Sequence, residues 1–287
     1  MNIAELSQHG LLQITGGDAR SFLHAQLTNS VEGLGTNRAC HAGWCSAKGR
    51  LLASLLVVPH EDGFLLQLAR DLAAPVAKRL AMFILRSKVR IANLSEEWRQ
   101  YGVWGADASA GLPALGASAP QELLGVATGP RWTAVRLGAE RYLMFGRSTI
   151  EPTTAVEDWM LQDVHAGIPL VTQATQDLFV PQMVNFERIG AVDFQKGCYP
   201  GQEIVARAQY RGQIKRRMVR VRTPVSLRPG QDLYADDVPG QPAGTVVNVA
   251  GDEALAVLQI STVESGSAVR AEAGGSALEV LPLPYQA

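Results

Sequence analysis

The chain has 287 residues, 47% of them hydrophobic, and a formal net charge of -1, so it can bury a full core and is long enough for about two domains. Its longest apolar runs fall far short of the ~20 residues that a membrane-spanning helix needs, and no membrane association is expected. The amino terminus, MNIAELSQHG, lacks the basic and apolar regions of a secretory signal, which predicts a cytoplasmic protein.

The amino-terminal part predicts an α+β unit. A strand is expected over 11–16, followed by a helix over 19–31 that Asp18 caps. Residues 41–69 are typical of two apolar strands joined by the turn HEDG, which predicts a hairpin. A helix over 71–87 has an acid at its start, a proline in its first turn and basic residues near its end, the charge order that a helix dipole favours.

The middle of the chain continues with strands and one long connection. A strand over 87–94 leads to the stretch 105–125, whose Gly, Ala and Pro content predicts a surface connection with one short helix. Residues 131–138 and 140–146 predict a second hairpin.

A helix is expected over 154–165, where Thr154 and Glu157 have capping-box spacing and Trp159 falls on the apolar face. Beyond Arg216, short alternating strands broken by glycine and proline turns predict a small β-barrel, with a boundary near residue 212.

The cysteines give little sign of a disulfide or metal site. Cys40, Cys45 and Cys198 are too few and too sparse for a disulfide framework, so reduced thiols are expected. Neither CxxC nor HExxH occurs, and an iron–sulfur cluster usually needs four thiolates. The sequence therefore predicts no resident metal.

The stretch KGCYPGQE combines a thiol with glycines that permit unusual backbone angles, which predicts a shaped loop displaying Cys198. Lys196 would favour the thiolate, although a small buried cysteine in a tight turn is an equal alternative. Tyr199, Gln202 and Glu203 supply a ring, an amide and a carboxylate, which together suit a heterocycle with polar edges. Glu203 could instead pair with Arg207 on the next helical turn.

Positive charge is concentrated around this stretch. Residues 196–222 hold eight basic residues and one acid, a net charge of +7 in a chain that is otherwise acidic. Such a segment can attract phosphates or carboxylates, or it can simply be a basic face in contact with water.

Residues 178–218 resemble the signature region of the YgfZ family of bacterial folate-binding proteins, whose hallmark is KGCYxGQE. The flanking PQxxN and VARxxxRGxxKR also match, and weaker similarity extends through ITG, FLHAQLTN, CSAKGR and PLPY. The family is related to the glycine-cleavage aminomethyltransferase, or T-protein.

This resemblance implies an α+β fold of three subdomains around a central channel. The expected units are a discontinuous first part over 1–36 and 140–211, a ferredoxin-like part over 37–139, and a carboxy-terminal β-barrel over 212–287.

The resemblance also implies tetrahydrofolate binding and a supporting role for iron–sulfur enzymes or their assembly proteins, including radical enzymes that methylthiolate tRNA. Cys198 is the expected reactive residue. Trp159 matches a tryptophan that lines the folate site, and His9 stands where relatives can have a second one. The remaining expected cofactor-binding residues are Asn185, Lys196, Tyr199, Gln202, Glu203 and Arg207. On the basis of charge rather than of the resemblance, folate's glutamate tail is expected near bases such as Arg207 or Arg211.

Two other functions are weighed against this one. T-proteins carry acids in the strand after the glycine equivalent to Gly49, but this chain has Ala53 and Ser54 there, so aminomethyl transfer loses its obvious general acid or base. Direct tRNA binding through the basic segment is disfavoured because no recognised RNA-binding module is present. A classical enzyme is therefore not expected.

Overall fold

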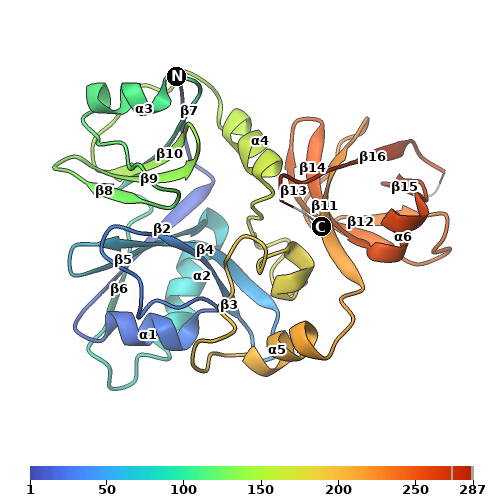
Figure 1. Ribbon diagram of the computed structural model, residues 1–287, viewed down its shortest axis with the longest axis horizontal. Coiled ribbons are helices and arrows are strands. Elements are labelled where there is room, and N and C mark those ends of the chain that lie inside the picture. The colour runs from blue at the N-terminus through green and yellow to red at the C-terminus, as the bar shows by residue number, and fades with distance from the viewer. Residues whose placement is uncertain (273, 286–287) are drawn as a thin grey trace.

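The computed structural model describes residues 1–272 and 274–285. Two five-stranded antiparallel sheets form one side of the molecule, and a closed β-barrel forms the other (Figure 1). Among the described residues, no helix is long and apolar enough to cross a membrane. The α+β class and the carboxy-terminal barrel expected from the sequence are confirmed.

The first sheet has the strand order β3-β4-β5-β2-β6. Its strands are β2 (His9–Thr15), β3 (Cys40–Cys45), β4 (Leu51–His60), β5 (Gly63–Ala69) and β6 (Arg90–Asn93). The hairpin around HEDG is confirmed, because β4 pairs with β5 from Leu56 opposite Gln67 to His60 opposite Gly63. The two strands expected over 41–69 are three, because the chain turns at Gly49, whose φ of 68° suits a glycine.

Helices α1 (Ala19–Gln26) and α2 (Arg70–Ala81) pack against this sheet, and both are shorter than expected. Asp18 does not cap α1 through its side chain; its carboxylate instead accepts a hydrogen bond from the Lys88 backbone N–H at 2.7 Å. In α2 the proline, Pro75, lies inside the helix rather than in the first turn, because the helix already begins at Arg70.

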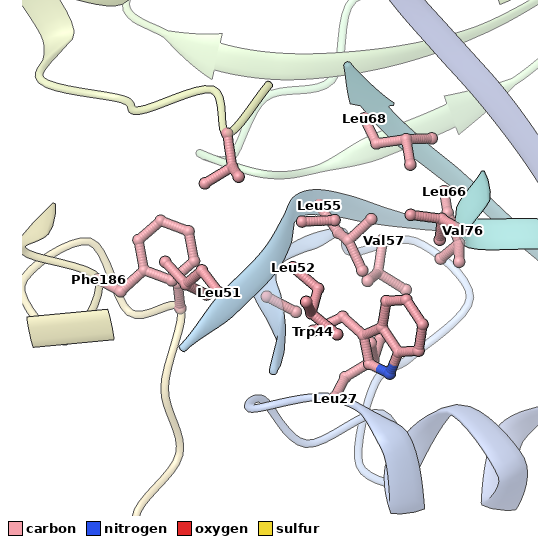
Figure 2. Packing of buried hydrophobic residues seen from close by; sticks show 14 of the residues in the cluster. Leu27, Trp44, Leu51, Leu52, Leu55, Val57, Leu66, Leu68, Val76 and Phe186 are labelled. Carbon is pink, nitrogen blue, oxygen red and sulfur yellow. The ribbon is translucent and has the colours of Figure 1, made fainter. Parts of the chain in front are cut away.

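All ten residues of β4 are buried, since this strand is covered on both faces. Leu55 and Val57 belong to the cluster that includes the helices, while Leu56 and Val58 belong to the cluster shared with the second sheet. Figure 2 shows the first cluster, with Trp44 on the side of α1. Burial on both faces explains why β4 is a continuous apolar run rather than an alternating one.

The second sheet has the order β1-β7-β10-β9-β8. Its strands are β1 (Asn2–Glu5), β7 (Arg99–Trp104), β8 (Val126–Thr128), β9 (Trp132–Gly138) and β10 (Arg141–Gly146). The predicted β9–β10 hairpin is confirmed. The long connection holds α3 (Ala108–Gly111) and the 3-10 turn η1 (Leu112–Leu115).

The sheets pair strands across the predicted boundaries of the first two subdomains. Strand β2, before residue 36, pairs with β5, and β10, after residue 139, pairs with β7 and β9. The proposed division into 1–36 with 140–211, 37–139 and 212–287 remains a prediction. Each of the two sheets contains strands from both of the first two proposed units.

Helix α4 (Val156–Ala166) lies between the sheets and the barrel (Figure 1). The predicted capping box is wrong: Ala155 is the N-cap, and the Thr154 hydroxyl donates to the Asp158 carboxylate rather than to the backbone. Trp159 is buried as expected. A Cβ on Gly102 of β7 would lie 2.1 Å from the Trp159 ring, so only glycine permits this close packing.

The remaining segment, η2 (Pro181–Val184), and helix α5 (Gln202–Tyr210) lead into the barrel. The barrel consists of β11 (Arg216–Arg222), β12 (Asp232–Ala235), β13 (Gly244–Ala250), β14 (Glu253–Gln259), β15 (Val269–Arg270) and β16 (Ala277–Leu281), with α6 (Ile260–Ser265) between β14 and β15.

Candidate functional site

Two adjoining cavities lie where α4 meets the first sheet. The inner cavity, of about 50 Å³, is lined by residues that include His9, Ser54 and Trp159. The outer cavity, of about 290 Å³, extends past Arg141 to Tyr285 near the carboxy terminus. Both share a wall made by His41, Leu137, Asp163, Ile168 and Ile189. We call the pair the central cavities.

Helix α4 contributes Trp159 and Asp163, which are one helical turn apart and therefore on the same face. The Arg141 guanidinium, from β10, lies 4.1 Å from the centre of the Trp159 ring and forms an ion pair with Asp163. The Trp104 ring packs edge-on against Trp159, with ring centroids 5.6 Å apart. The tryptophan is therefore held between an aromatic edge and a cation, and it forms a fixed wall.

Two neutral histidines complete this wall. Burial lowers the pKa of His9 to about 4, with Asp163 opposing and Arg141 reinforcing this shift, and the same causes lower the pKa of His41 to about 4. Each ring at neutral pH thus offers one N–H donor and one nitrogen acceptor.

Two buried polar atoms beside the central cavities lack a hydrogen-bond partner among the described residues. They are Nδ1 of His9, whose side chain belongs to a residue only 6% exposed, and Nε of Arg141. Buried polar atoms are nearly always paired in folded proteins, and an unpaired one is costly. These atoms are therefore suited to contact a polar ligand.

Lys196 anchors the KGCYPGQE loop to the segment at the end of α1. Its ammonium donates to the carbonyls of Leu27, at 2.6 Å, and of His24 at the end of α1, and it lies 4.8 Å from the centre of the Tyr199 ring. Burial lowers the pKa of Lys196 to about 8, an effect that nearby Asp193 and other anions partly offset. Lys196 therefore ties the loop to α1 and is already engaged.

The same loop exposes Cys198 while burying Tyr199. Gly201 has a φ of 79°, and a Cβ there would lie 2.3 Å from the Ser46 carbonyl oxygen, so the loop needs glycine to reach the β3–β4 turn. The predicted shaped loop with a displayed thiol thus matches the geometry. Burial is the main factor that raises the pKa of the Tyr199 hydroxyl.

The other two polar residues of the motif have weak engagements. The Gln202 side chain donates to the Lys196 carbonyl at 3.5 Å. Glu203 and Arg207 are both exposed, and the ion pair that was the alternative for Glu203 is not formed.

The structure separates the predicted site residues into three groups, of which Asn185 alone forms the third. His9 and Trp159 line the inner cavity, whereas Lys196, Cys198, Tyr199, Gln202, Glu203 and Arg207 line neither central cavity. Figure 1 shows α5, which follows the loop, far from α4. The expected cofactor-binding residues therefore do not all line one cavity, and their roles in cofactor binding stay predictions.

Asn185 acts at a third place. Its side-chain amide donates to the Met218 carbonyl at 2.8 Å, and its oxygen accepts from Arg217 at 3.4 Å. Asn185 therefore joins the end of η2 to β11 of the barrel, and it lines neither central cavity.

The positions where a T-protein acid was expected contain no carboxylate. Ala53 is fully buried, and Ser54 lines the inner cavity with its hydroxyl accepting a hydrogen bond from the Val171 N–H at 2.8 Å. The acid in the cavity is instead Asp163, which the sequence reasoning missed. Its position four residues after Trp159 was the available signal.

His41, Arg141, Arg188 and Tyr285 were also missed, because they reach the cavities from separate elements that carry no motif. Among the described residues, no group of three or more His, Cys, Asp or Glu side chains could hold a metal ion.

The chain is similar to known proteins over nearly its whole length. The family described as "CAF17, C-terminal beta-barrel domain" matches residues 215–284. The chain is 31% identical to the tRNA-modifying protein YgfZ of Cronobacter sakazakii and 29% identical to that of Escherichia coli strain SE11, covering 99% of this chain and 93% of each relative.

Among solved structures, the glycine cleavage system aminomethyltransferase T from Bartonella henselae superposes with a TM-score of 0.73 at 16% identity. The match covers 98% of this chain and 85% of that protein. The likeness establishes a T-protein-like fold.

Proposed function

The chain belongs to the YgfZ family of tRNA-modifying proteins, and we propose that it is a tetrahydrofolate-binding accessory factor that supports iron–sulfur enzymes active on tRNA. The proposal assigns folate to the central cavities and the contact with client enzymes to the exposed thiol. The two assignments are independent of each other, because Cys198 lines neither central cavity.

The observation that carries the folate assignment is the set of polar groups facing the central cavities. A pterin ring presents N–H donors and nitrogen and oxygen acceptors along its edge. Asp163 would accept from ring N–H groups, while neutral His9 and His41 would donate or accept. The unpaired Nδ1 of His9 is the strongest sign of a missing polar partner.

Because of the cavity sizes, we assign the body of the ligand to the outer cavity and only the pterin edge to the inner one, where it would meet His9. The inner cavity of about 50 Å³ has room for water molecules, while the outer one of about 290 Å³ is near the lower end of small-molecule pockets, roughly 300 Å³. Arg141 and Arg188 line the outer cavity, so the carboxylates of folate would meet these residues rather than Arg207.

Calorimetric titration of tetrahydrofolate tests the assignment. We expect wild-type protein to bind and Asp163→Asn to bind about tenfold or more weakly, since a hydrogen bond to a charged group contributes ~1.5–3 kcal/mol. Glu203→Gln makes the same chemical change on the exposed α5 and should bind like the wild type. Absence of binding by the wild type would remove the folate assignment.

The client assignment rests on Cys198. Cys40 and Cys45 are buried, and burial raises the pKa of each thiol to about 12, whereas Cys198 is exposed on a loop fastened by Lys196. An exposed thiol on a fixed loop can meet a second protein, which a buried thiol cannot.

Restoration of tRNA methylthiolation in a strain lacking the factor tests this part. Cys198→Ser should fail to restore the modification, while Cys40→Ser, at a buried thiol, should restore it if the variant accumulates normally. Full restoration by Cys198→Ser would show that the thiol is dispensable.

Aminomethyl transfer is the less supported alternative. Ser54 occupies the cavity position where an acid was expected, and its hydroxyl does not replace the carboxylate that a T-protein would use as general acid or base. Incubation with tetrahydrofolate and an aminomethylated carrier protein should therefore yield no methylene-tetrahydrofolate above the uncatalysed rate.

A further inference from the structure

A surface with exposed apolar and basic side chains lies beside the signature loop. It combines α5, the β3–β4 turn and the segment before η2. We call it the α5 surface and define it by Leu178, Ile204, Tyr210, Lys48, Arg50, Arg207 and Arg211. We propose that the α5 surface is a docking site for an acidic face of a partner protein, an inference that does not depend on folate binding.

The three elements of this surface are in contact. A Cβ on Gly49 would lie 2.8 Å from the Ile204 Cβ, so the turn packs directly against α5. The Arg50 guanidinium donates to the Leu178 carbonyl, which joins the turn to the segment before η2. Along α5, Ile204 and Arg207 are three residues apart and share one helix face, and Arg211 is the C-cap that directly follows the helix.

Three large side chains with apolar surface are exposed to solvent here. Leu178 is 40%, Ile204 42% and Tyr210 69% exposed. Tyr210 is also held in place by an edge-on contact with Phe194, at a centroid distance of 5.9 Å. An exposed apolar group bordered by polar residues is typical of a protein interaction surface.

The charged residues of the α5 surface indicate the sign of the partner's charge. Within the described part of the chain, Lys48, Arg207 and Arg211 form no ion pair, so their charges remain available. Two acids lie nearby: Glu203 on α5, and Asp177, whose carboxylate accepts from Ser46. The surface thus keeps an excess of positive charge, which complements an acidic partner.

The apolar centre favours a protein over RNA. Single-stranded RNA is held by several aromatic platforms and phosphate contacts, and aliphatic Leu178 and Ile204 provide no stacking surface. Protein interfaces, in contrast, commonly pair an apolar centre with arginine and tyrosine. Cys198 lies three residues before Gly201, which contacts the same turn, so a partner docked here would lie beside the thiol.

A defined peptide can test this proposal on the full chain. The probe is an amphipathic helical peptide of about 18 residues, roughly five turns, with leucines on one face flanked by glutamates. A second peptide carries lysine in place of every glutamate. Fluorescence anisotropy measures binding, and the rate of maleimide modification of Cys198 reports whether the bound peptide covers this face, since Cys40 and Cys45 are buried.

Two matched charge-reversal variants locate the binding. Arg207→Glu with Arg211→Glu changes the α5 surface, while Arg86→Glu with Arg228→Glu changes two exposed arginines that form no ion pair within the described residues. Ile204→Ser removes an apolar contact without a change of charge. Because all five positions are exposed, thermal unfolding should show that each variant is folded.

We expect the acidic peptide to bind the wild type, to slow Cys198 modification, and to bind about tenfold more weakly to the Arg207/Arg211 variant. Ile204→Ser should also weaken binding, and the Arg86/Arg228 variant should match the wild type. Equal binding of both peptides to the wild type would overturn the proposal, and so would an equal loss of acidic-peptide binding in both charge-reversal variants. A third contrary result would be that the acidic peptide does not bind the wild type, while the Arg207/Arg211 variant loses tRNA binding or self-association.

Discussion

The central cavities and the signature loop differ in how their polar groups are satisfied. At the cavities, Nδ1 of His9 and Nε of Arg141 are buried without partners among the described residues. In the loop, the buried Lys196 ammonium has two carbonyl acceptors, and the loop's thiol faces outward. The cavities thus have the character of a ligand site, whereas the loop is a rigid support for one exposed group.

This difference shows that the most recognisable sequence motif and the ligand-facing wall need not be the same place. The motif is short and continuous because one loop must fit against α1 and the β3–β4 turn. The cavity wall comes from β2, β3, β10, α4 and the carboxy-terminal segment, and no short pattern joins these elements.

The largest expected effect is a loss of folding stability at low pH, caused by the two histidines that line the central cavities. Folding lowers the pKa of His9 and of His41 from 6.5 to about 4, so the unfolded chain binds more protons between these pH values. The free energy of unfolding should therefore decrease as pH falls from 6.5 towards 4, by on the order of 3 kcal/mol for each histidine. Urea unfolding across this pH range measures it.

Substitution identifies the source of that dependence. His9→Gln and His41→Gln should each remove part of the loss at low pH, while Cys198→Ser in the loop should leave it unchanged. The same pH dependence in both histidine variants as in the wild type would contradict the assignment of neutral histidines to the cavities.

A smaller effect is expected when Lys196, which anchors the loop, is replaced. Lys196→Met leaves the carbonyls of His24 and Leu27 without their donor, and should lower the free energy of unfolding at pH 7 by about 2–3 kcal/mol. Lys48→Met makes the same change at an exposed site with no ion pair among the described residues, and should cost less than about 0.5 kcal/mol. Equal losses in the two variants would show that Lys196 does not fasten the loop.

The smallest effect is expected at Glu203 and Arg207. Because these residues do not form the ion pair that their spacing allows, a double-mutant cycle of Glu203→Gln and Arg207→Met should give a coupling energy near zero, within about 0.3 kcal/mol. A coupling above about 1 kcal/mol would mean that the pair forms in solution and that Arg207 is less available to a partner.

Local patterns predicted much of the fold. The HEDG hairpin, the β9–β10 hairpin, α4 and the barrel follow from alternation, helical spacing and turn residues that act over short distances. The capping box failed because the Thr154 hydroxyl bonds to Asp158, a competition between side chains that spacing alone does not resolve. The turn at Gly49 was missed because CSAKGR lies within a long apolar stretch.

The candidate site was predictable only in part. Trp159 and His9 reach the inner cavity, and the resemblance pointed to both. Asp163 lies on the face of α4 that Trp159 already marked, so helical spacing could have identified it. Arg141 and Tyr285 could not be found in this way, because tertiary packing brings them from positions far apart in the chain to the same cavity.

The histidine side chains provide the most direct test of where folate binds. His9 and His41 line the central cavities, while His24 lies beside the signature loop, with Nε2 3.8 Å from the Cβ position of Gly197. Imidazole ¹⁵N spectra of the labelled protein, assigned by single substitutions, can follow all five histidines during titration with tetrahydrofolate. We predict shifts at His9 and His41 with His24 unchanged; a shift at His24 with His9 and His41 unchanged would contradict binding in the central cavities.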